Sequence, residues 1–118
     1  MPTFTLFNNE SDIRTFLAGQ SIFAEGQPGD GAMYALLEGE VDIIRQERVL
    51  ETIMSGNVFG EMALLDNQPR SASAIAKTDC RVAAITEKRF TLVVSQNPHF
   101  ALDMMRLLVG RVRRNMAS

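Results

Sequence analysis

The chain contains 118 residues, of which 46% are apolar, and it carries a formal charge of −2 at pH 7. This length and composition are typical of one folded domain with its own core, so we expect residues 1–118 to form a single domain. The small acidic balance excludes a general electrostatic attraction to nucleic acid or to an acidic membrane. No apolar run reaches the length of a membrane span, and Cys80 as the only cysteine excludes an internal disulfide, so we expect a cytoplasmic protein.

The first part of the chain, residues 4–86, has the pattern of short strands separated by turns. Apolar segments at 13–17 and 21–24 are followed by the glycine-rich stretch EGQPGDG at 25–31. Three glycines and a proline within seven residues cannot continue a strand or a helix, so this stretch is predicted to be a loop. The strand pattern resumes over 32–44 and is interrupted at Gly39.

A hairpin tip is predicted at 46–48, with 49–54 as the returning strand and another turn at 55–57. The segments SASAIAK (71–77) and CRVAAIT (80–86) alternate small and apolar residues, as paired strands do. Many short strands at near-regular spacing favour a β-barrel or a jelly roll over a parallel sheet.

The last third changes to helical patterns, over 87–96 and 98–116. Asn97 and Pro98 fit the cap and the first position of the second helix, and the short segment 96–98 between the helices is the candidate hinge. A seam with alternating spacings of four and three residues runs along the second helix and predicts a dimer contact. Its members are Ala101, Met105, Leu108, Val112 and Asn115.

The segment FGEMALLDNQPRSAS, at 59–73, has the residue types of an anion site. Gly60 lets the backbone approach a ligand, and the free N–H groups at the start of a short helix favour negative charge. Arg70 supplies a planar fork for two phosphate oxygens. A carboxylate beside a phosphate would be repelled by it. The position of Glu61 is explained if its carboxylate accepts a hydrogen bond from a ribose 2′-hydroxyl next to the phosphate. An arginine for phosphate and a glutamate for ribose together predict a nucleotide rather than free phosphate.

This segment closely resembles the phosphate-binding cassette of cyclic nucleotide-binding domains. These domains occur in the catabolite-activator family of bacterial regulators, in protein kinase A regulatory subunits and in cyclic-nucleotide-gated channels. The resemblance covers nearly the whole chain, because EGQPGDG, the YALLEGEVDI strand pair, the cassette and two closing helices follow in the family's order. It implies a mainly β fold with C-terminal helices, in which an eight-stranded jelly-roll β-barrel at about 4–86 is closed by helices at 87–96 and 98–116.

The resemblance also implies a regulator in signal transduction that binds cyclic AMP, expected ahead of cyclic GMP, without acting as an enzyme. The ligand would be held without a metal or a further cofactor, and its occupancy would pass through the last helix of a homodimer to a downstream partner protein. Arg70 would neutralise the cyclic phosphate, and Glu61 would hold the ribose 2′-hydroxyl. The implied ligand-binding set is Phe59, Gly60, Glu61, Met62, Ala63, Arg70, Ser71 and Ala72 in the cassette, with Arg111 and Asn115 on the last helix.

Other interpretations fit parts of the sequence. Arg70 and Glu61 alone are compatible with a surface salt bridge that needs no ligand. The same fold would also serve as a ligand-free module for protein interaction or dimerisation through its terminal helix. A cupin-like enzyme needs several histidines around a metal, and His99 is the only histidine in the chain. The arginines near the C-terminus are explained by favourable charge at a helix end rather than by nucleic-acid binding.

Overall fold

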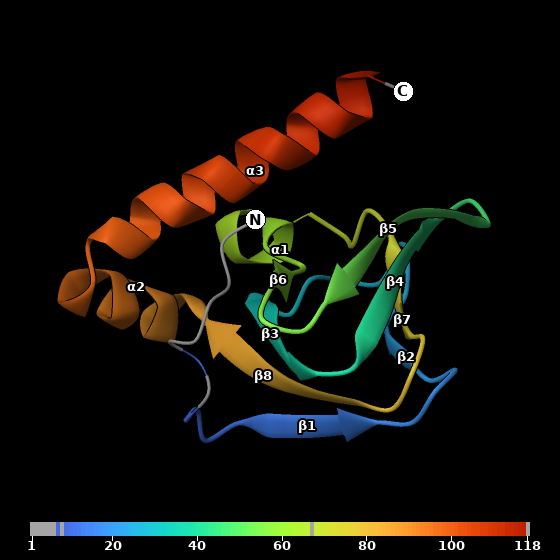
Figure 1. The fold of residues 1–118 in the computed structure, drawn as a ribbon, viewed down its shortest axis with the longest axis horizontal. Helices are drawn as coiled ribbons and strands as arrows, with labels where there is room; N and C mark the ends of the chain where they lie inside the picture. The colour runs from blue at the N-terminus through green and yellow to red at the C-terminus, as the bar shows by residue number, and fades with distance from the viewer. Residues whose placement is uncertain (1–6, 8, 67, 118) are drawn as a thin grey trace. The chain divides into compact units, whose positions relative to one another are not determined.

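The computed structural model describes residues 7, 9–66 and 68–117, with side chains described as far as Arg114. Within this range eight strands lie in two antiparallel sheets of four, and three helices follow or interrupt them (Figure 1). The elements are β1 (Ile13–Phe16), β2 (Ser21–Phe23), β3 (Ala32–Glu38), β4 (Glu40–Arg45), β5 (Arg48–Met54), β6 (Val58–Phe59), α1 (Met62–Leu65), β7 (Ser73–Ala76), β8 (Cys80–Thr86), α2 (Glu87–Gln96) and α3 (His99–Ala117).

The sheet orders are β1-β8-β3-β6 and β2-β7-β4-β5. The mainly β jelly roll of eight strands with C-terminal helices is therefore confirmed, although its strands form two sheets rather than one continuously bonded barrel. The chain divides into two compact units, one of strands up to Glu87 and one of helices from Lys88 onward. The expected start of the barrel at residue 4 lies outside the described residues.

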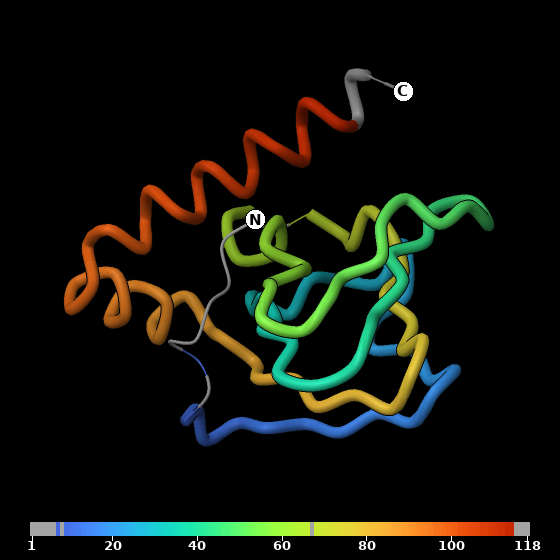
Figure 2. The backbone as a smooth tube through the Cα atoms, viewed as in Figure 1, coloured from blue at the N-terminus to red at the C-terminus, as the bar shows by residue number. Residues whose placement is uncertain are grey.

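The hairpin β4–β5 forms where the turn pattern predicts it. Arg45 pairs with Arg48, so the loop consists of Gln46 and Glu47, which both have positive φ. Positive φ at both central positions is the turn geometry whose twist matches that of the flanking strands. This turn is an outer corner of the strand unit (Figure 2).

Strands that follow one another in the sequence often belong to different sheets. β7 pairs with β2 and β4, while β8 pairs with β1 and β3, so the expectation that SASAIAK and CRVAAIT pair with each other is wrong. The YALLEGEVDI segment is likewise no strand pair, because the chain changes sheet at Gly39 between β3 and β4. Gly39 has φ +97°, and a Cβ there would collide with the Asp79 carbonyl oxygen and lie 2.8 Å from the Cys80 sulfur. This corner therefore requires glycine.

The core lies between the inner faces of the two sheets. Alternate residues of β3 and β8 face inward from one sheet, and small residues of β7 face them from the other. The buried cluster consists of Phe23, Tyr34, Leu36, Val41, Ile53, Phe59, Ala74, Ala76, Cys80, Val82 and Ala84. Three of its members are aromatic and stack on one another, with ring centroids 5.6–6.1 Å apart: Phe23, Tyr34 and Phe59.

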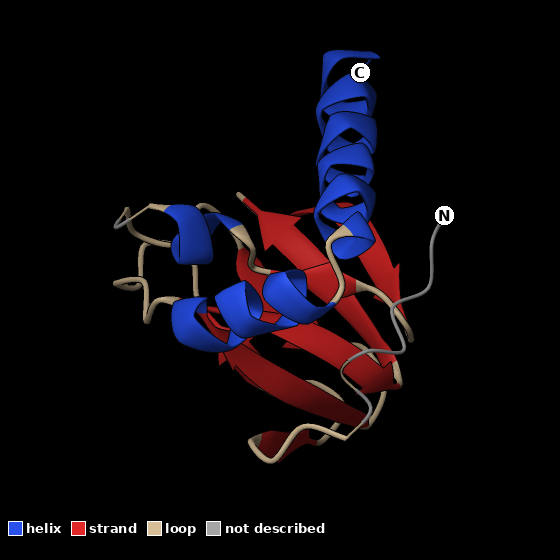
Figure 3. Cartoon of the chain, turned by 90° about the vertical axis from the view of Figure 1, so that its left-hand side faces the viewer, coloured by secondary structure: helices blue, strands red, loops and turns tan. Residues whose placement is uncertain are grey.

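The helices α2 and α3 lie where the helical patterns predict them. Asn97 lies between the two: its side chain donates to the Val93 carbonyl of α2, and its backbone carbonyl accepts from the Phe100 N–H in the first turn of α3. The rings of Phe90 and Phe100 lie 5.6 Å apart and join the two helices. Helix α3 is continuous along its length (Figure 3). Its buried apolar residues are Phe100, Met104 and Leu107, and its exposed ones are Leu102, Met105, Val109 and Val112.

Candidate functional site: a buried arginine beside a glycine turn

The turn that follows β6 brings the backbone against an arginine. Phe59 ends the strand in the core, and Gly60 takes φ +73°, a conformation that favours glycine. A Cβ at Gly60 would lie 2.9 Å from Arg70 Nη1 and 3.1 Å from a ring carbon of Phe23. A side chain here would thus displace either the guanidinium or the aromatic ring.

The Arg70 side chain is only 3% exposed and is held on several sides. Its Nη1 donates to the Gly60 carbonyl at 3.0 Å, and its Nη2 donates to Asp30 Oδ1 at 2.7 Å and to the Ala32 carbonyl at 3.0 Å. The guanidinium carbon also lies 4.0 Å from the centroid of the Phe23 ring, in a cation–π contact. Among the described residues these bonds use three of the five N–H groups of a guanidinium, which leaves two to donate to an oxyanion.

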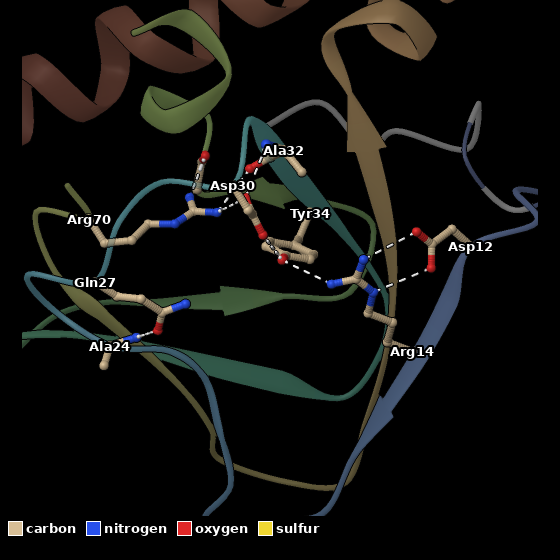
Figure 4. A network of polar contacts seen from close by, with 9 residues as sticks. Asp12, Arg14, Ala24, Gln27, Asp30, Ala32, Tyr34 and Arg70 are labelled. Atoms are coloured by element: carbon tan, nitrogen blue, oxygen red, sulfur yellow. Dashed lines mark hydrogen bonds and ion pairs between the residues drawn. The ribbon is translucent and has the colours of Figure 1, made fainter. Parts of the chain in front are cut away.

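Asp30 supplies the charge that balances Arg70. Its Oδ1 also accepts a bond from the Ala32 N–H at 3.1 Å, and its Oδ2 accepts one from the Tyr34 hydroxyl at 2.8 Å (Figure 4). Burial on its own raises the pKa of the Asp30 carboxyl. The bonds from Tyr34 and Ala32 and the charge of Arg70 outweigh burial, so the pKa of Asp30 is lowered and the group stays ionised.

The glycine-rich loop before β3 is tied to the backbone of the same arginine. The Arg70 N–H donates to the Gln27 carbonyl at 2.8 Å, and the Gly26 N–H donates to the Arg70 carbonyl at 2.8 Å. The loop is closed on itself by the Gln27 side chain, which accepts from the Ala24 N–H at 3.0 Å (Figure 4). Backbone and side chain of Arg70 are therefore both bonded to one loop, forty or more positions earlier in the chain.

The predicted cassette residues gather in the strand unit around this turn. Neither Arg70 nor Glu61 lies on the surface, with exposed fractions of 6% and 8%, so a surface salt bridge does not describe them. The hydroxyl of Ser71 lies 3.8 Å from the sulfur of Met62, and both residues are exposed. The buried members of the predicted set are Phe59, Glu61, Ala63, Arg70 and Ala72.

The two predicted residues outside the cassette lie on α3, in the helical unit. Arg111 is half-buried, and the side chain of Asn115 lies outside the described side chains. Their contact with a purine base stays a prediction.

Sequence reasoning missed the partners that hold Arg70. Asp30, Phe23 and Tyr34 each lie more than thirty positions from Arg70 in the sequence, so no local pattern links them to it. The Asp30 side chain is 43% exposed, so nothing in the glycine-rich loop EGQPGDG marks it as a partner of Arg70.

Residues 13–97 match the family model of the cyclic nucleotide-binding domain. The match spans both the loop that carries Asp30 and the cassette that carries Arg70. The chain belongs to the cyclic nucleotide-binding domain family. The eight strands, the glycine turn at Gly60 and the buried Arg70 are thus the parts of one cyclic nucleotide-binding domain.

Known members of the family resemble this domain in sequence and fold. The cAMP-dependent protein kinase regulatory subunit of Aspergillus niger is 44% identical over 81 residues, which is 67% of this chain and 20% of that protein. The catabolite activator protein of Thermus thermophilus superposes with a TM-score of 0.80 at 33% identity, covering 89% of this chain and 51% of that one. The EAL enzyme Bd1971, solved with cyclic GMP and with cyclic AMP, is 36% identical with TM-scores of 0.65 and 0.62, over 89% of this chain and 29% of that one.

The chain therefore spans a fifth to about half of the length of these relatives. In the described part of the chain, no helix is both long enough and apolar enough to cross a membrane. Over the same residues, no group of three or more His, Cys, Asp and Glu side chains is placed to hold a metal ion.

Proposed function

We propose that this domain is a sensor that binds a cyclic nucleotide, cyclic AMP in preference to cyclic GMP, and releases it unchanged. The observation that carries the proposal is the buried Arg70 guanidinium, fixed by the Gly60 carbonyl and by Asp30, with N–H groups left to donate to an oxyanion. A buried arginine pairs strongly with a phosphate because little water competes for its N–H groups. Glu61, one residue beyond the glycine turn, accepts the ribose 2′-hydroxyl in this proposal.

The preference for cyclic AMP rests on similarity to one named relative. The fungal relative at 44% identity is a cAMP-dependent regulatory subunit, whereas the EAL enzyme at 36% identity has been solved with either nucleotide. We assign the purine to the last helix, where Arg111 and Asn115 are the predicted contacts.

The output of the sensor is proposed to pass through α3. A ligand biases two states only by its difference in affinity for them, so the helices must contact the bound nucleotide differently in each state. The short segment 96–98, between the ends of α2 and α3, is the proposed hinge. The exposed apolar residues Met105 and Val112 belong to the predicted seam and support a homodimer or a partner protein on α3. The lone, buried Cys80 supports a reducing, cytoplasmic setting.

Calorimetry with cyclic AMP, cyclic GMP and 5′-AMP tests binding and preference together. We expect cyclic AMP to bind most tightly, because the cyclic phosphate suits the arginine fork and the fungal relative is a cAMP-dependent regulatory subunit. Arg70→Lys should weaken binding about ten- to a hundredfold, since it removes a charged, forked hydrogen bond worth about 1.5–3 kcal/mol. Arg81→Lys, in an exposed ion pair with Glu38, is the matched control and should leave affinity unchanged.

The ribose contact has its own readout. If Glu61 accepts the 2′-hydroxyl, Glu61→Ala should bind cyclic AMP and its 2′-deoxy analogue equally, whereas the wild type should favour cyclic AMP. Phosphorus NMR of cyclic AMP after long incubation should show the cyclic phosphate intact. A folded wild-type protein that binds no cyclic nucleotide at millimolar concentration would reject the proposal in favour of a ligand-free interaction module.

A further inference from the structure

The polar contacts of Arg70 continue away from the anion site. Asp30 divides its carboxylate between two partners, with Oδ1 on Arg70 at 2.7 Å and Oδ2 on the Tyr34 hydroxyl at 2.8 Å. The Tyr34 hydroxyl in turn accepts a bond from Arg14 Nη1 at 3.3 Å, and Arg14 pairs with Asp12 at 3.2 Å. Figure 4 shows this row of side chains running from the loop before β7 to strand β1.

The direction of each bond in this row is determined by its ends. A guanidinium can only donate, and an ionised carboxylate can only accept. The Tyr34 hydroxyl has one proton, so it must accept from Arg14 and donate to Asp30. Its orientation is therefore fixed by the two charged neighbours, and the positive charge of Arg14 polarises the O–H group toward Asp30.

The ring of Tyr34 is held as firmly as its hydroxyl. Tyr34 is 2% exposed, and its ring stacks on Phe59 and Phe23 with centroids 5.6 Å and 6.0 Å apart. Asp30, by contrast, lies on a loop, and its side chain is 43% exposed. The Ala32 N–H and Arg70 both bond to Oδ1, so the rigid Tyr34 hydroxyl is the partner that holds the other oxygen, Oδ2, of this half-exposed carboxylate.

The pKa shifts of Tyr34 and Asp30 agree with a hydroxyl that donates to an ionised carboxylate. Burial and the bond to Asp30 raise the pKa of the Tyr34 hydroxyl, so it keeps its proton. Among the effects that lower the pKa of Asp30, the bond from Tyr34 is the largest.

We infer that Tyr34 is a positioning residue for the anion site, with Arg14 behind it: its hydroxyl holds Asp30 in the rotamer that presents Oδ1 to Arg70. The inference rests on the proposed binding of a cyclic nucleotide at Arg70. It makes strand β1 part of the site, although neither Arg14 nor Tyr34 contacts the ligand. Without the hydroxyl, Asp30 keeps only its bonds at Oδ1 and restrains Arg70 less, so ordering Arg70 costs more when the anion binds.

The test is a double-mutant cycle measured by calorimetry with cyclic AMP. Tyr34→Phe keeps the ring and removes only the hydroxyl, and it should weaken binding about three- to tenfold. In an Asp30→Ala background the same change should have no effect, because the link to Arg70 is already absent. A purely structural role would lower the melting temperature in both backgrounds without changing affinity, and that result would overturn the inference.

Arg14→Gln provides a second test of the inference, at a residue outside the core. Arg14 is 47% exposed, and the matched control Arg81 is 45% exposed and also paired with a carboxylate. Arg14→Gln should weaken binding about twofold or more, and Arg81→Gln should leave it unchanged. Equal affinities for these two variants, together with an unchanged Tyr34→Phe affinity, would contradict the inference.

A measurement without ligand separates this inference from the proposed function. In nitrogen NMR of the free protein, rotation of the Arg70 guanidinium should be slow in the wild type and in Arg81→Gln, and faster in Tyr34→Phe. If the wild type binds no cyclic nucleotide, the proposed function fails, and this rotation rate still decides whether Tyr34 holds Arg70 through Asp30. Equal rates in the wild type and Tyr34→Phe would overturn the inference that Tyr34 holds Arg70 through Asp30.

Discussion

At the scale of single residues, Arg70 is a charge removed from water and compensated by several partners. A buried arginine without partners would cost several kcal/mol of folding free energy. Here the Asp30 carboxylate, two backbone carbonyls and the face of Phe23 share that charge. Three guanidinium N–H groups take part in these bonds, and the other two are the groups that the proposed function gives to an oxyanion. The same residues thus hold the guanidinium in place, and in the proposed function they also orient it toward the nucleotide.

Asp30 gives this charge pair a dependence on pH. Its pKa is lower in the folded chain than in the unfolded chain, where an aspartate titrates near about 4. The stabilisation is therefore present above about pH 4 and is lost as the pH falls toward the lower folded pKa. Urea unfolding of Asp30→Asn between about pH 6 and 2 should show a smaller loss of stability on acidification than the wild type. Glu38→Gln, at an exposed ion pair, is the control, and identical pH profiles for Asp30→Asn and the wild type would contradict this assignment.

At the scale of elements, α3 has one buried and one exposed set of apolar residues, and the seam predicted from the sequence matches the exposed set only in part. Its buried residues Phe100, Met104 and Leu107 follow spacings of four and three. A second set with spacings of three, four and three is exposed: Leu102, Met105, Val109 and Val112. Exposed apolar residues in a heptad-like row are typical of a helix that pairs with another helix. The predicted seam shares Met105 and Val112 with this row.

The predicted seam implies that the protein dimerises, and negative charges introduced in the seam should separate the dimer. In sedimentation velocity across a range of concentrations, we expect the wild type to dimerise weakly. Met105→Glu combined with Val112→Glu should shift the protein to monomer, because two carboxylates would face their copies in the seam. Leu92→Glu, at an exposed apolar residue of α2 outside the row, adds a carboxylate and should leave association unchanged. A wild type that is monomeric at every concentration would reject the dimer.

At the scale of the whole molecule, the strands and the helices form two compact units joined at the start of α2. The anion site lies entirely within the strand unit, whereas the predicted base contacts Arg111 and Asn115 lie on α3. A ligand that binds the folded chain and not the unfolded chain raises the free energy of unfolding. Cyclic AMP should therefore stabilise this chain.

Thermal unfolding measures this stabilisation by the ligand. At one hundred times the dissociation constant, cyclic AMP should add about 2.7 kcal/mol of stability, which corresponds to a rise in melting temperature on the order of 10 °C for a chain of this size. The nucleotide 5′-AMP, which lacks the cyclic phosphate, should give a much smaller shift at the same concentration. A melting temperature that ignores cyclic AMP, in a protein that unfolds cooperatively, would favour the ligand-free module.

The sequence alone determined the strands, the loop at 25–31, the two closing helices and the cassette with Gly60 and Arg70. These features depend on local patterns: the alternation of apolar residues, turn residues and the residue types of an anion site. Only the tertiary structure decided that β7 and β8 lie in different sheets, and that Asp30 and Tyr34 hold Arg70. Such contacts join residues that lie far apart in the chain. Strand register and sheet packing determine them, and neither can be predicted from the residue pattern of a single segment.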